Sequence, residues 1–286
     1  QGLPLNECGK LVVALDEKEL ETLHELERRG KQNGSNIQMI SEEEAREIEP
    51  NVITYRKALY SPDTATVDPS LICQKIKEEL LTRNVDIACS KQYLGHDGNV
   101  IKTSGGNIEG GTVINAAGLY ADQIAHDFGF GLRYTIIPFK GLYLKYGKNK
   151  SDVRINVYPV PNLMNPFLGV HFTTTVDGTI KIGPTAIPCF WREQYDFSSR
   201  FHTAEMAEIL FWEARLFFAD SFHFRKLAFE EIHKYSKTYL VSLASKLVRN
   251  IDPKGFSEFT NPGIRAQLLD RKTLSLVQDF AVEGDS

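Results

Sequence analysis

The spacing of apolar and polar positions predicts a chain that contains both strands and helices. Residues 11–15 form an apolar run typical of a buried strand. Leucines then recur at Leu20, Leu23 and Leu26, which indicates one face of a helix that ends near Gly30. This first part of the chain is therefore predicted to be scaffold.

Polar residues mark where helices begin. Asp16 and Ser41 each precede a glutamate by three positions, which is the pattern of a capping box. Asp68 stands directly before a proline, which favours an N-cap followed by the first helical residue. Apolar residues between positions 71 and 80 predict an apolar face on that helix, with Cys73 buried in it.

The next part of the chain has mainly the pattern of strands. Apolar residues alternate over 85–89, and glycine turns follow at 97–98 and 105–106. A further short buried strand is predicted around Ile114. We expect a strand, a meander and a return strand after the helix that starts at Asp68.

Two longer regions follow. Residues 132–182 are predicted to be antiparallel strands broken by prolines, Pro166 among them, with a hairpin turn at 177–178. Residues 203–250 are predicted to be helical, with Thr203 as the N-cap. The first part of this helical region is dense in aromatic residues, and we expect most of them to pack in the core.

One motif suggests a site for a ligand. The strand predicted at Ile114 runs into small residues, and a helix opens at 120–122. Small residues let a backbone approach a flat or phosphorylated group, and a helix N-terminus offers free N–H groups to negative charge. A tightly packed corner between a strand and a helix has the same pattern, so the motif alone does not decide.

Composition and charge exclude several functions. The net charge of −4 argues against nucleic-acid binding through bulk electrostatics. No apolar run approaches membrane-spanning length. The four scattered cysteines contain no Cys-x-x-Cys pair, and the histidines have no metal-binding spacing. We therefore expect no metal site, reduced and mostly buried thiols, and a cytoplasmic location.

Several segments, in one order along nearly the whole chain, resemble a known family. They read CGKLVVA (8–14), INAAGLYAD (114–122), YPVP (158–161), PFLGVHFT (166–173), DG (177–178), IGP (182–184) and PGIRAQ (262–267). Together they resemble L-2-hydroxyglutarate dehydrogenase/oxidase, within the FAD-dependent D-amino-acid oxidase and glycine oxidase superfamily. The resemblance implies FAD as cofactor.

The chain departs from that superfamily in one respect. It has no Gly-x-Gly-x-x-Gly, since the nearest approach at Gly129 and Gly131 has Tyr134 in the third position. Superfamily members carry this fingerprint before the region that begins here at Gln1. We therefore expect a sequence truncated at its N-terminus, and also at its C-terminus, where relatives have a further flavin-contacting segment.

The resemblance implies a mixed α/β fold. An incomplete FAD-binding Rossmann-like domain would join an antiparallel-sheet substrate domain with helices. Residues 1–55 and 129–255 would belong to the substrate domain and 56–128 to the FAD-binding domain. Residues 256–286 would return into the FAD-binding domain.

Two residues are the first candidates for catalysis. Arg265 matches an arginine that grips the substrate carboxylate in related oxidases, and a guanidinium suits this role because it makes two parallel bonds. The alternative for Arg265 is a structural ion pair, for example with Asp270. His171 lies in a stretch whose alternation places Leu168 and Phe172 on a core face and the imidazole on the other face. Neutral His171 is therefore a candidate base for a hydroxyl proton.

Other residues complete the predicted site. Lys140, Tyr143 and Tyr158 are candidates for binding substrate. Relatives tend to have arginine at Lys140, and a surface cation is the alternative there. Tyr158 has an alternative as a buried tyrosine bonded to backbone. The resemblance implies FAD contacts from Asn115, Ala116, Ala117, Gly118, Gly263 and Ile264.

The resemblance implies oxidation of a 2-hydroxy dicarboxylate, L-2-hydroxyglutarate, to 2-oxoglutarate. Electrons would pass to oxygen or, as in some relatives, to a membrane quinone, which would place the protein at the periphery of the inner membrane. Two alternatives stay open. One is an amino-acid oxidase of the same superfamily, and the other is an inactive fragment that lacks the pyrophosphate-binding turn.

Overall fold

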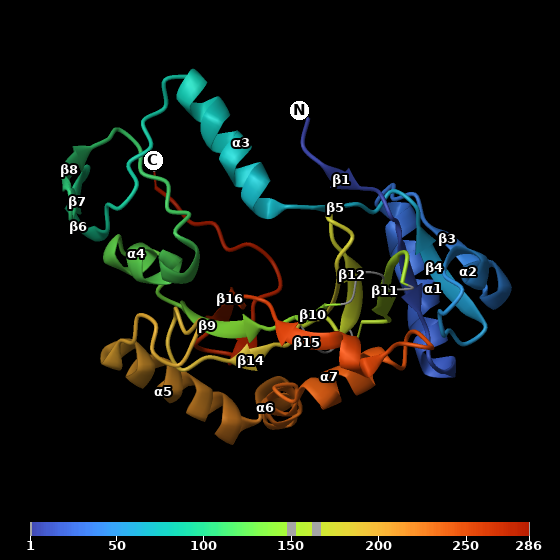
Figure 1. Ribbon diagram of the computed structural model, residues 1–286. Helices are drawn as coiled ribbons and strands as arrows, with labels where there is room; N and C mark the ends of the chain where they lie inside the picture. Colours follow the sequence, from blue (N-terminus) through green and yellow to red (C-terminus); the bar gives the residue numbers. More distant parts are fainter. Residues whose placement is uncertain (1, 148–152, 162–166, 286) are drawn as a thin grey trace. The chain divides into compact units, whose positions relative to one another are not determined.

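The computed structural model describes residues 2–147, 153–161 and 167–285, so Pro166 lies outside the described residues. The chain divides into two compact units (Figure 1). Unit 1 comprises Gln1–Ile72, Gly141–Ile187 and Lys226–Gly263, and unit 2 comprises Cys73–Lys140, Pro188–Arg225 and Ile264–Ser286. Each unit combines helices with sheets, which confirms the predicted mixed α/β class.

Unit 1 is built on an eight-stranded sheet of order β15-β10-β13-β12-β11-β2-β4-β3. Its strands pair antiparallel except for β11 and β2, which run parallel. The elements wholly or mainly in this unit are β1 (Leu5–Asn6), β2 (Lys10–Val13), α1 (Glu17–Gln32), β3 (Gln38–Ser41), α2 (Glu42–Ile48), β4 (Lys57–Ser61), β5 (Thr66–Val67), β10 (Leu144–Tyr146), β11 (Asn156–Pro159), β12 (His171–Thr174), β13 (Ile180–Gly183), α6 (Phe224–His233), α7 (Lys237–Ala244), a 3-10 turn (Pro253–Gly255) and β15 (Phe256–Phe259).

One face of this sheet forms the main core of unit 1. Leu11, Val157, Phe172 and Ile182 are fully buried on it and pack in one cluster with Leu240 of α7. Because successive side chains of a strand point to opposite faces, the residues between these positions lie on the other face. The alternation predicted around His171 is thereby confirmed, although Leu168 precedes β12 and is exposed rather than in the core.

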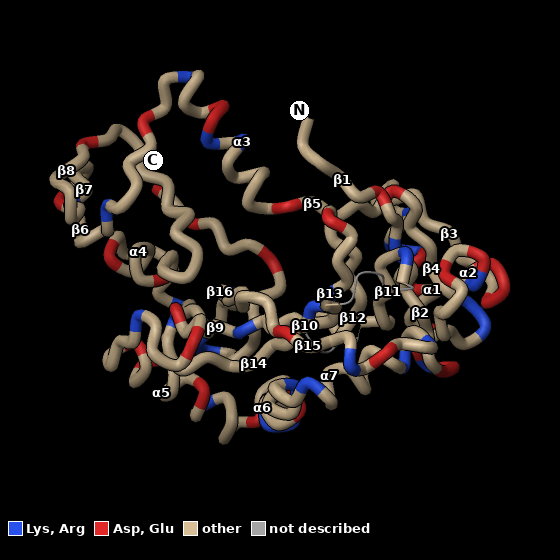
Figure 2. Tube along the Cα trace, in the orientation of Figure 1, with Lys and Arg blue, Asp and Glu red and all other residues tan. Residues whose placement is uncertain are grey.

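The predicted caps of α1 and α2 are confirmed. The Asp16 side chain accepts a hydrogen bond from the Glu19 backbone N–H, and Ser41 with Glu44 forms a complete capping box. Both helices lie beside β3 and β4 (Figure 1). Lysines, arginines and carboxylates are interleaved along α1 (Figure 2), as expected for its solvated face.

Unit 2 contains a four-stranded sheet of order β14-β9-β16-β17 and a separate meander of order β6-β7-β8 (Figure 1). The meander confirms the turns predicted at 97–98 and 105–106. The elements wholly or mainly in this unit are α3 (Pro69–Thr82), β6 (Tyr93–Asp97), β7 (Val100–Thr103), β8 (Gly106–Glu109), a 3-10 turn (Gly118–Tyr120), α4 (Ala121–Asp127), β9 (Tyr134–Gly141), β14 (Ile187–Pro188), α5 (Thr203–Ala219), a 3-10 turn (Ser221–His223), β16 (Gly263–Asp270) and β17 (Ser275–Leu276).

Three predictions for this unit are wrong. The apolar stretches at 85–89 and around Ile114 form no strand, and 87% of Ile114 is exposed. The helix begins at Pro69 as predicted, but none of its residues is buried, so Cys73 is exposed. An apolar segment becomes a buried strand only when a neighbouring strand pairs with it, and among the described residues none pairs with these stretches.

The helical region after residue 200 is shorter and more broken than predicted. His202, not Thr203, caps α5, because its imidazole accepts the Glu205 backbone N–H. Left-handed backbone at Asp220 and Phe222 then separates α5 from α6. Core packing is confirmed for Trp212 and Phe224 but is wrong for Phe211 and Phe218, which are 56% and 85% exposed.

No helix in the described part of the chain combines the length and the apolar character needed to cross a membrane.

Candidate functional site

Three of the predicted site residues share the face of the unit 1 sheet that points away from the core. Tyr158 lies on β11, His171 on β12, and Tyr143 directly before β10. His171 is opposite Gly183 in the register of β12 and β13. A Cβ atom at Gly183 would lie 2.7 Å from the Tyr143 ring, so the glycine lets that ring approach the strand beside His171.

His171 is held in a defined orientation. Its ring stacks on Tyr158 with 3.7 Å between centroids and 16° between planes. Its Nδ1 lies 2.9 Å from the Gly169 carbonyl oxygen, which can only accept a hydrogen bond. Nδ1 therefore carries the proton in the neutral ring, and Nε2 carries the lone pair. This is the state that a base requires.

The protonation of His171 follows from its surroundings. Only 3% of the residue is exposed, and this burial lowers the pKa of His171 to about 4. The hydrogen bond to Gly169 acts in the opposite direction, and the charge of Lys10 lowers the pKa of His171 further. The imidazole is consequently neutral near pH 7. Burial also raises the pKa values of Tyr143 and Tyr158, so both phenols keep their protons.

Lys10 belongs to the same face, and the sequence prediction missed it. Its Nζ lies 5.6 Å from the centre of the Tyr158 ring. A signal was present, because alternation from the buried Leu11 and Val13 places Lys10 on the face opposite the core. The site in unit 1 thus contains a cation beside the stacked pair.

Lys140 belongs to unit 2 and is only 7% exposed, so the alternative of a surface cation is wrong. Burial lowers the pKa of Lys140, and the neighbouring Cys189 and Asp196 oppose that shift. Burial also raises the pKa of Cys189 to about 12 and that of Glu213 to about 8. Lys140 therefore shares its surroundings with a thiol that keeps its proton at pH 7 and with the ionised Asp196 carboxylate, and Glu213 acts on that thiol.

Arg265 also lies in unit 2, where its strand β16 is the neighbour of β9 in the sheet. The residue is exposed. Asp270 forms an ion pair with Arg133 and accepts the backbone N–H groups of Lys272 and Thr273. Asp270 thus has a cationic partner in Arg133, and the alternative of a structural ion pair for Arg265 stays open.

The residues predicted to contact FAD do not all lie in one unit. Residues 115–118 and Ile264 belong to unit 2, and Gly263 is the last residue of unit 1. The Asn115 side chain stabilises the turn that contains it. Its amide N–H donates to the Ala121 carbonyl oxygen, and its amide oxygen accepts the Ala117 backbone N–H. We expect Asn115 to shape the turn through these two bonds.

A cleft of about 930 Å³ borders this turn within unit 2. Residues 111–115, the start of α4 and residues 281–285 line it, together with the stacked rings of His96 and Phe128. A Cβ atom added at Gly111 would meet nothing within 4 Å, so the cleft is open at the backbone there. The sequence prediction gave His96 no role, yet His96 lies in the wall of this cleft.

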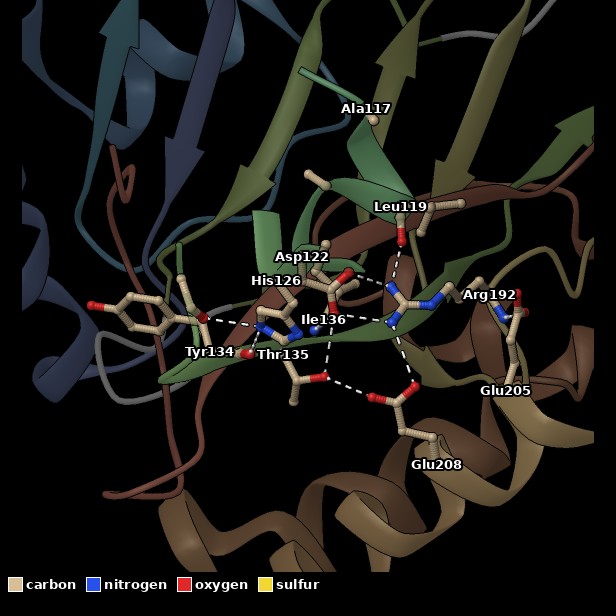
Figure 3. Close-up of polar contacts among 12 residues, drawn as sticks. Ala117, Leu119, Asp122, His126, Tyr134, Thr135, Ile136, Arg192, Glu205 and Glu208 are labelled. Carbon is tan, nitrogen blue, oxygen red and sulfur yellow. Dashed lines mark hydrogen bonds and ion pairs between the residues drawn. The ribbon is translucent and has the colours of Figure 1, made fainter. Parts of the chain in front are cut away.

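Arg192 holds the turn in place through polar contacts with Leu119 and Asp122 (Figure 3). Its guanidinium donates to the Leu119 carbonyl oxygen and makes two bonds of 2.8 and 3.0 Å to the Asp122 carboxylate. The same carboxylate accepts the Ile136 backbone N–H at 2.8 Å. Arg192 and Asp122 therefore tie the start of α4 to strand β9.

The ion pair between Arg192 and Asp122 is buried. Arg192 is fully buried and Asp122 is 5% exposed. Burial acts to raise the pKa of Asp122, but the bonds and the charge of Arg192 outweigh it, so the pKa lies below its usual value. Neither partner was predicted, because they are 70 positions apart and no local pattern joins them.

The chain resembles known proteins along nearly its whole length. Residues 1–235 match the model of the family described as DAO, FAD dependent oxidoreductase. L-2-hydroxyglutarate dehydrogenase of Indibacter alkaliphilus is 32% identical over 100% of this chain and 72% of that protein. The mitochondrial L-2-hydroxyglutarate dehydrogenase of Bos taurus is 30% identical over 99% of this chain and 64% of that protein.

A solved structure has the same fold. The FAD-bound, dithionite-reduced L-α-glycerophosphate oxidase of Mycoplasma pneumoniae superposes with a TM-score of 0.69 and 20% identity. The superposition covers 95% of this chain and 64% of that one. The chain thus spans about two thirds of the length of such proteins, between 64% and 72% in these three comparisons.

Proposed function

Since the chain belongs to the family of FAD-dependent oxidoreductases, we propose that it oxidises the hydroxyl-bearing carbon of L-2-hydroxyglutarate to give 2-oxoglutarate. The observation that carries this proposal is the buried neutral His171, whose Nε2 has its lone pair available on the face of the unit 1 sheet opposite the main core. Relatives named L-2-hydroxyglutarate dehydrogenase in bacteria and animals support the choice of substrate.

The described residues fit part of FAD. The cleft in unit 2 is large enough for an adenosine moiety and borders the small residues that the sequence prediction assigned to the cofactor. We propose that it receives that end of FAD, with residues 111–115 as its lining and residues 116–118 next to them in the chain. When bound, FAD supplies the acceptor for the hydride.

The residues of the chain supply orientation and proton transfer. We propose that His171 accepts the hydroxyl proton at Nε2, while the Gly169 carbonyl and the Tyr158 ring hold the imidazole in place. Arg265 is proposed to hold the carboxylate next to the reacting carbon, and Lys140 and Tyr143 are further proposed contacts. The division of the chain into substrate and FAD-binding domains stays part of this proposal.

Arg265→Ala is expected to raise KM for L-2-hydroxyglutarate about 10- to 100-fold, because charge-assisted bonds to a carboxylate are worth roughly 1.5–3 kcal/mol. Arg265→Lys keeps the charge but loses the two parallel bonds, so its KM should lie between that of the unaltered protein and that of Arg265→Ala. Steady-state kinetics measures both. Arg83→Ala is the control, since the Arg83 side chain is 70% exposed directly after α3. An unchanged KM in Arg265→Ala would exclude the role.

The proposed function is tested by absorption spectra of the purified chain with FAD, before and after L-2-hydroxyglutarate is added without oxygen. We expect flavin bands that bleach with this substrate and not with L-glutamate, its 2-amino analogue. Bleaching by the amino acid alone would identify an amino-acid oxidase. Protein that never takes up FAD would contradict the proposal for this chain. Reoxidation by oxygen or by a soluble quinone then identifies the electron acceptor.

A further inference from the structure

Lys10 has an unusual place for a charged residue. It is the first residue of β2, which pairs parallel with β11, and it lies in register with Asn156. It is half-buried, and its ammonium group lies over the Tyr158 ring. The same Tyr158 ring stacks on the His171 imidazole. A cation, a phenol and a neutral imidazole are thus gathered on one face.

Among the described residues, no carboxylate forms a salt bridge with Lys10. Arg192 and Lys234, by contrast, pair with Asp122 and Glu231. The groups around it, Tyr158 and His171, are neutral near pH 7. The face of an aromatic ring attracts a partly desolvated ammonium group, and an anion would stabilise that group further.

These observations lead to a ligand class. We propose that the Lys10 ammonium binds the second carboxylate of the substrate, the one remote from the carbon whose hydroxyl proton His171 accepts. Lys10 then determines specificity for dicarboxylates over 2-hydroxy acids with an uncharged chain. This inference rests on the proposed function for the identity of the acid, but the anion site itself is independent of the flavin reaction.

Lys10 is better placed for this task than Lys140. The Lys140 side chain is 7% exposed and shares its surroundings with the thiol of Cys189, and its burial disfavours the charged form. Lys10 is more accessible and lies in the same unit as His171 and Tyr158. A compact ammonium also suits a carboxylate on a flexible chain, because it can donate to an oxygen that approaches from many directions.

The first test needs no flavin chemistry. Binding of glutarate and of butyrate to the purified chain is measured by calorimetry, for the unaltered protein, Lys10→Met and Lys181→Met. Lys181 is the matched control, because it lies on the same face of the same sheet, opposite Thr173. We expect Lys10→Met to raise the Kd of glutarate about tenfold or more and to leave butyrate unchanged. Lys181→Met should leave both values unchanged.

The second test uses turnover. The ratio of kcat/KM for L-2-hydroxyglutarate to that for L-2-hydroxybutyrate should fall at least about tenfold in Lys10→Met. A ratio equal to that of the unaltered protein, or glutarate binding that is absent or independent of Lys10, overturns the proposal. Glutarate binding that depends on Lys10 without any reduction of flavin keeps the anion site and removes the proposed reaction instead.

Discussion

Replacing His171 by alanine is expected to lower kcat about 10²- to 10⁴-fold, the range that a positioned general base contributes. The bound FAD should be unchanged, because the residue lies on the sheet of unit 1 and the proposed adenosine cleft lies in unit 2. Its neighbours Gly169 and Tyr158 would remain in place. Flavin absorbance and single-turnover rates of flavin reduction together measure both quantities.

The pH dependence provides an independent check on His171. The unprotonated imidazole is the active form, so activity is lost as the pH falls through the pKa of the group. Burial lowers that pKa to about 4, so kcat/KM should stay flat between pH 5 and 7 as far as His171 is concerned. A decrease of kcat/KM with a midpoint near pH 6.5 in the unaltered protein would mean that the base is a different, solvated group.

Exposed His24 offers the control for this substitution. Its side chain is 51% exposed on α1, and His24→Ala should have the turnover of the unaltered protein. Full turnover of His171→Ala across the same pH range would remove His171 from the mechanism. Loss of both turnover and flavin would instead indicate a folding defect, which circular dichroism distinguishes.

Local physics made much of the fold predictable from sequence. The caps at Asp16 and Ser41 depend only on residues three positions apart, and the structure has both. Strand alternation depends on one strand at a time, and it placed His171 on the face away from the core. These features could be derived because the atoms that decide them are neighbours in the chain.

Features that depend on distant partners could not be derived in this way. The apolar stretch at Ile114 has the composition of a strand, but in the described structure no strand pairs with it. The aromatic residues of α5 look like core residues, yet Phe211 and Phe218 are exposed, because the helix has only one face in the core. Alternation along its strand predicts the face on which Lys10 lies. It does not predict the contact with Tyr158, which is 148 positions later in the chain.

In the candidate site, too, single residues could be predicted from the sequence, but contacts between distant residues could not. Sequence resemblance identified Tyr158 and His171 separately, and only the structure showed that their rings stack. Arg192 was not identified at all, because neither its spacing nor its neighbours carry a signal for an ion pair with Asp122. Buried pairs of this kind are set by packing between segments, and so they are best recognised from coordinates.

Arg192→Ala is expected to lower the free energy of unfolding by about 3–5 kcal/mol, the usual cost of removing one partner of a buried ion pair. Asp122 would remain buried without a cation, and the Leu119 carbonyl would lose its donor. Chemical denaturation measures the loss. It should be larger at pH 7 than at pH 4, because an unpaired buried carboxyl has a raised pKa and is then neutral at the lower pH.

The same change should loosen the turn that borders the cleft. Hydrogen exchange of the amides from residue 115 to residue 124, and of Ile136, should become faster in Arg192→Ala, and the Kd of FAD should rise with it. Arg200→Ala is the matched control, because Arg200 is 74% exposed and pairs with Glu193 in the same unit. Arg192→Lys keeps the charge but cannot reach both Leu119 and Asp122, so an intermediate effect is expected. If stability falls while exchange and FAD affinity do not change, Arg192 supports the core of unit 2 and does not position the turn.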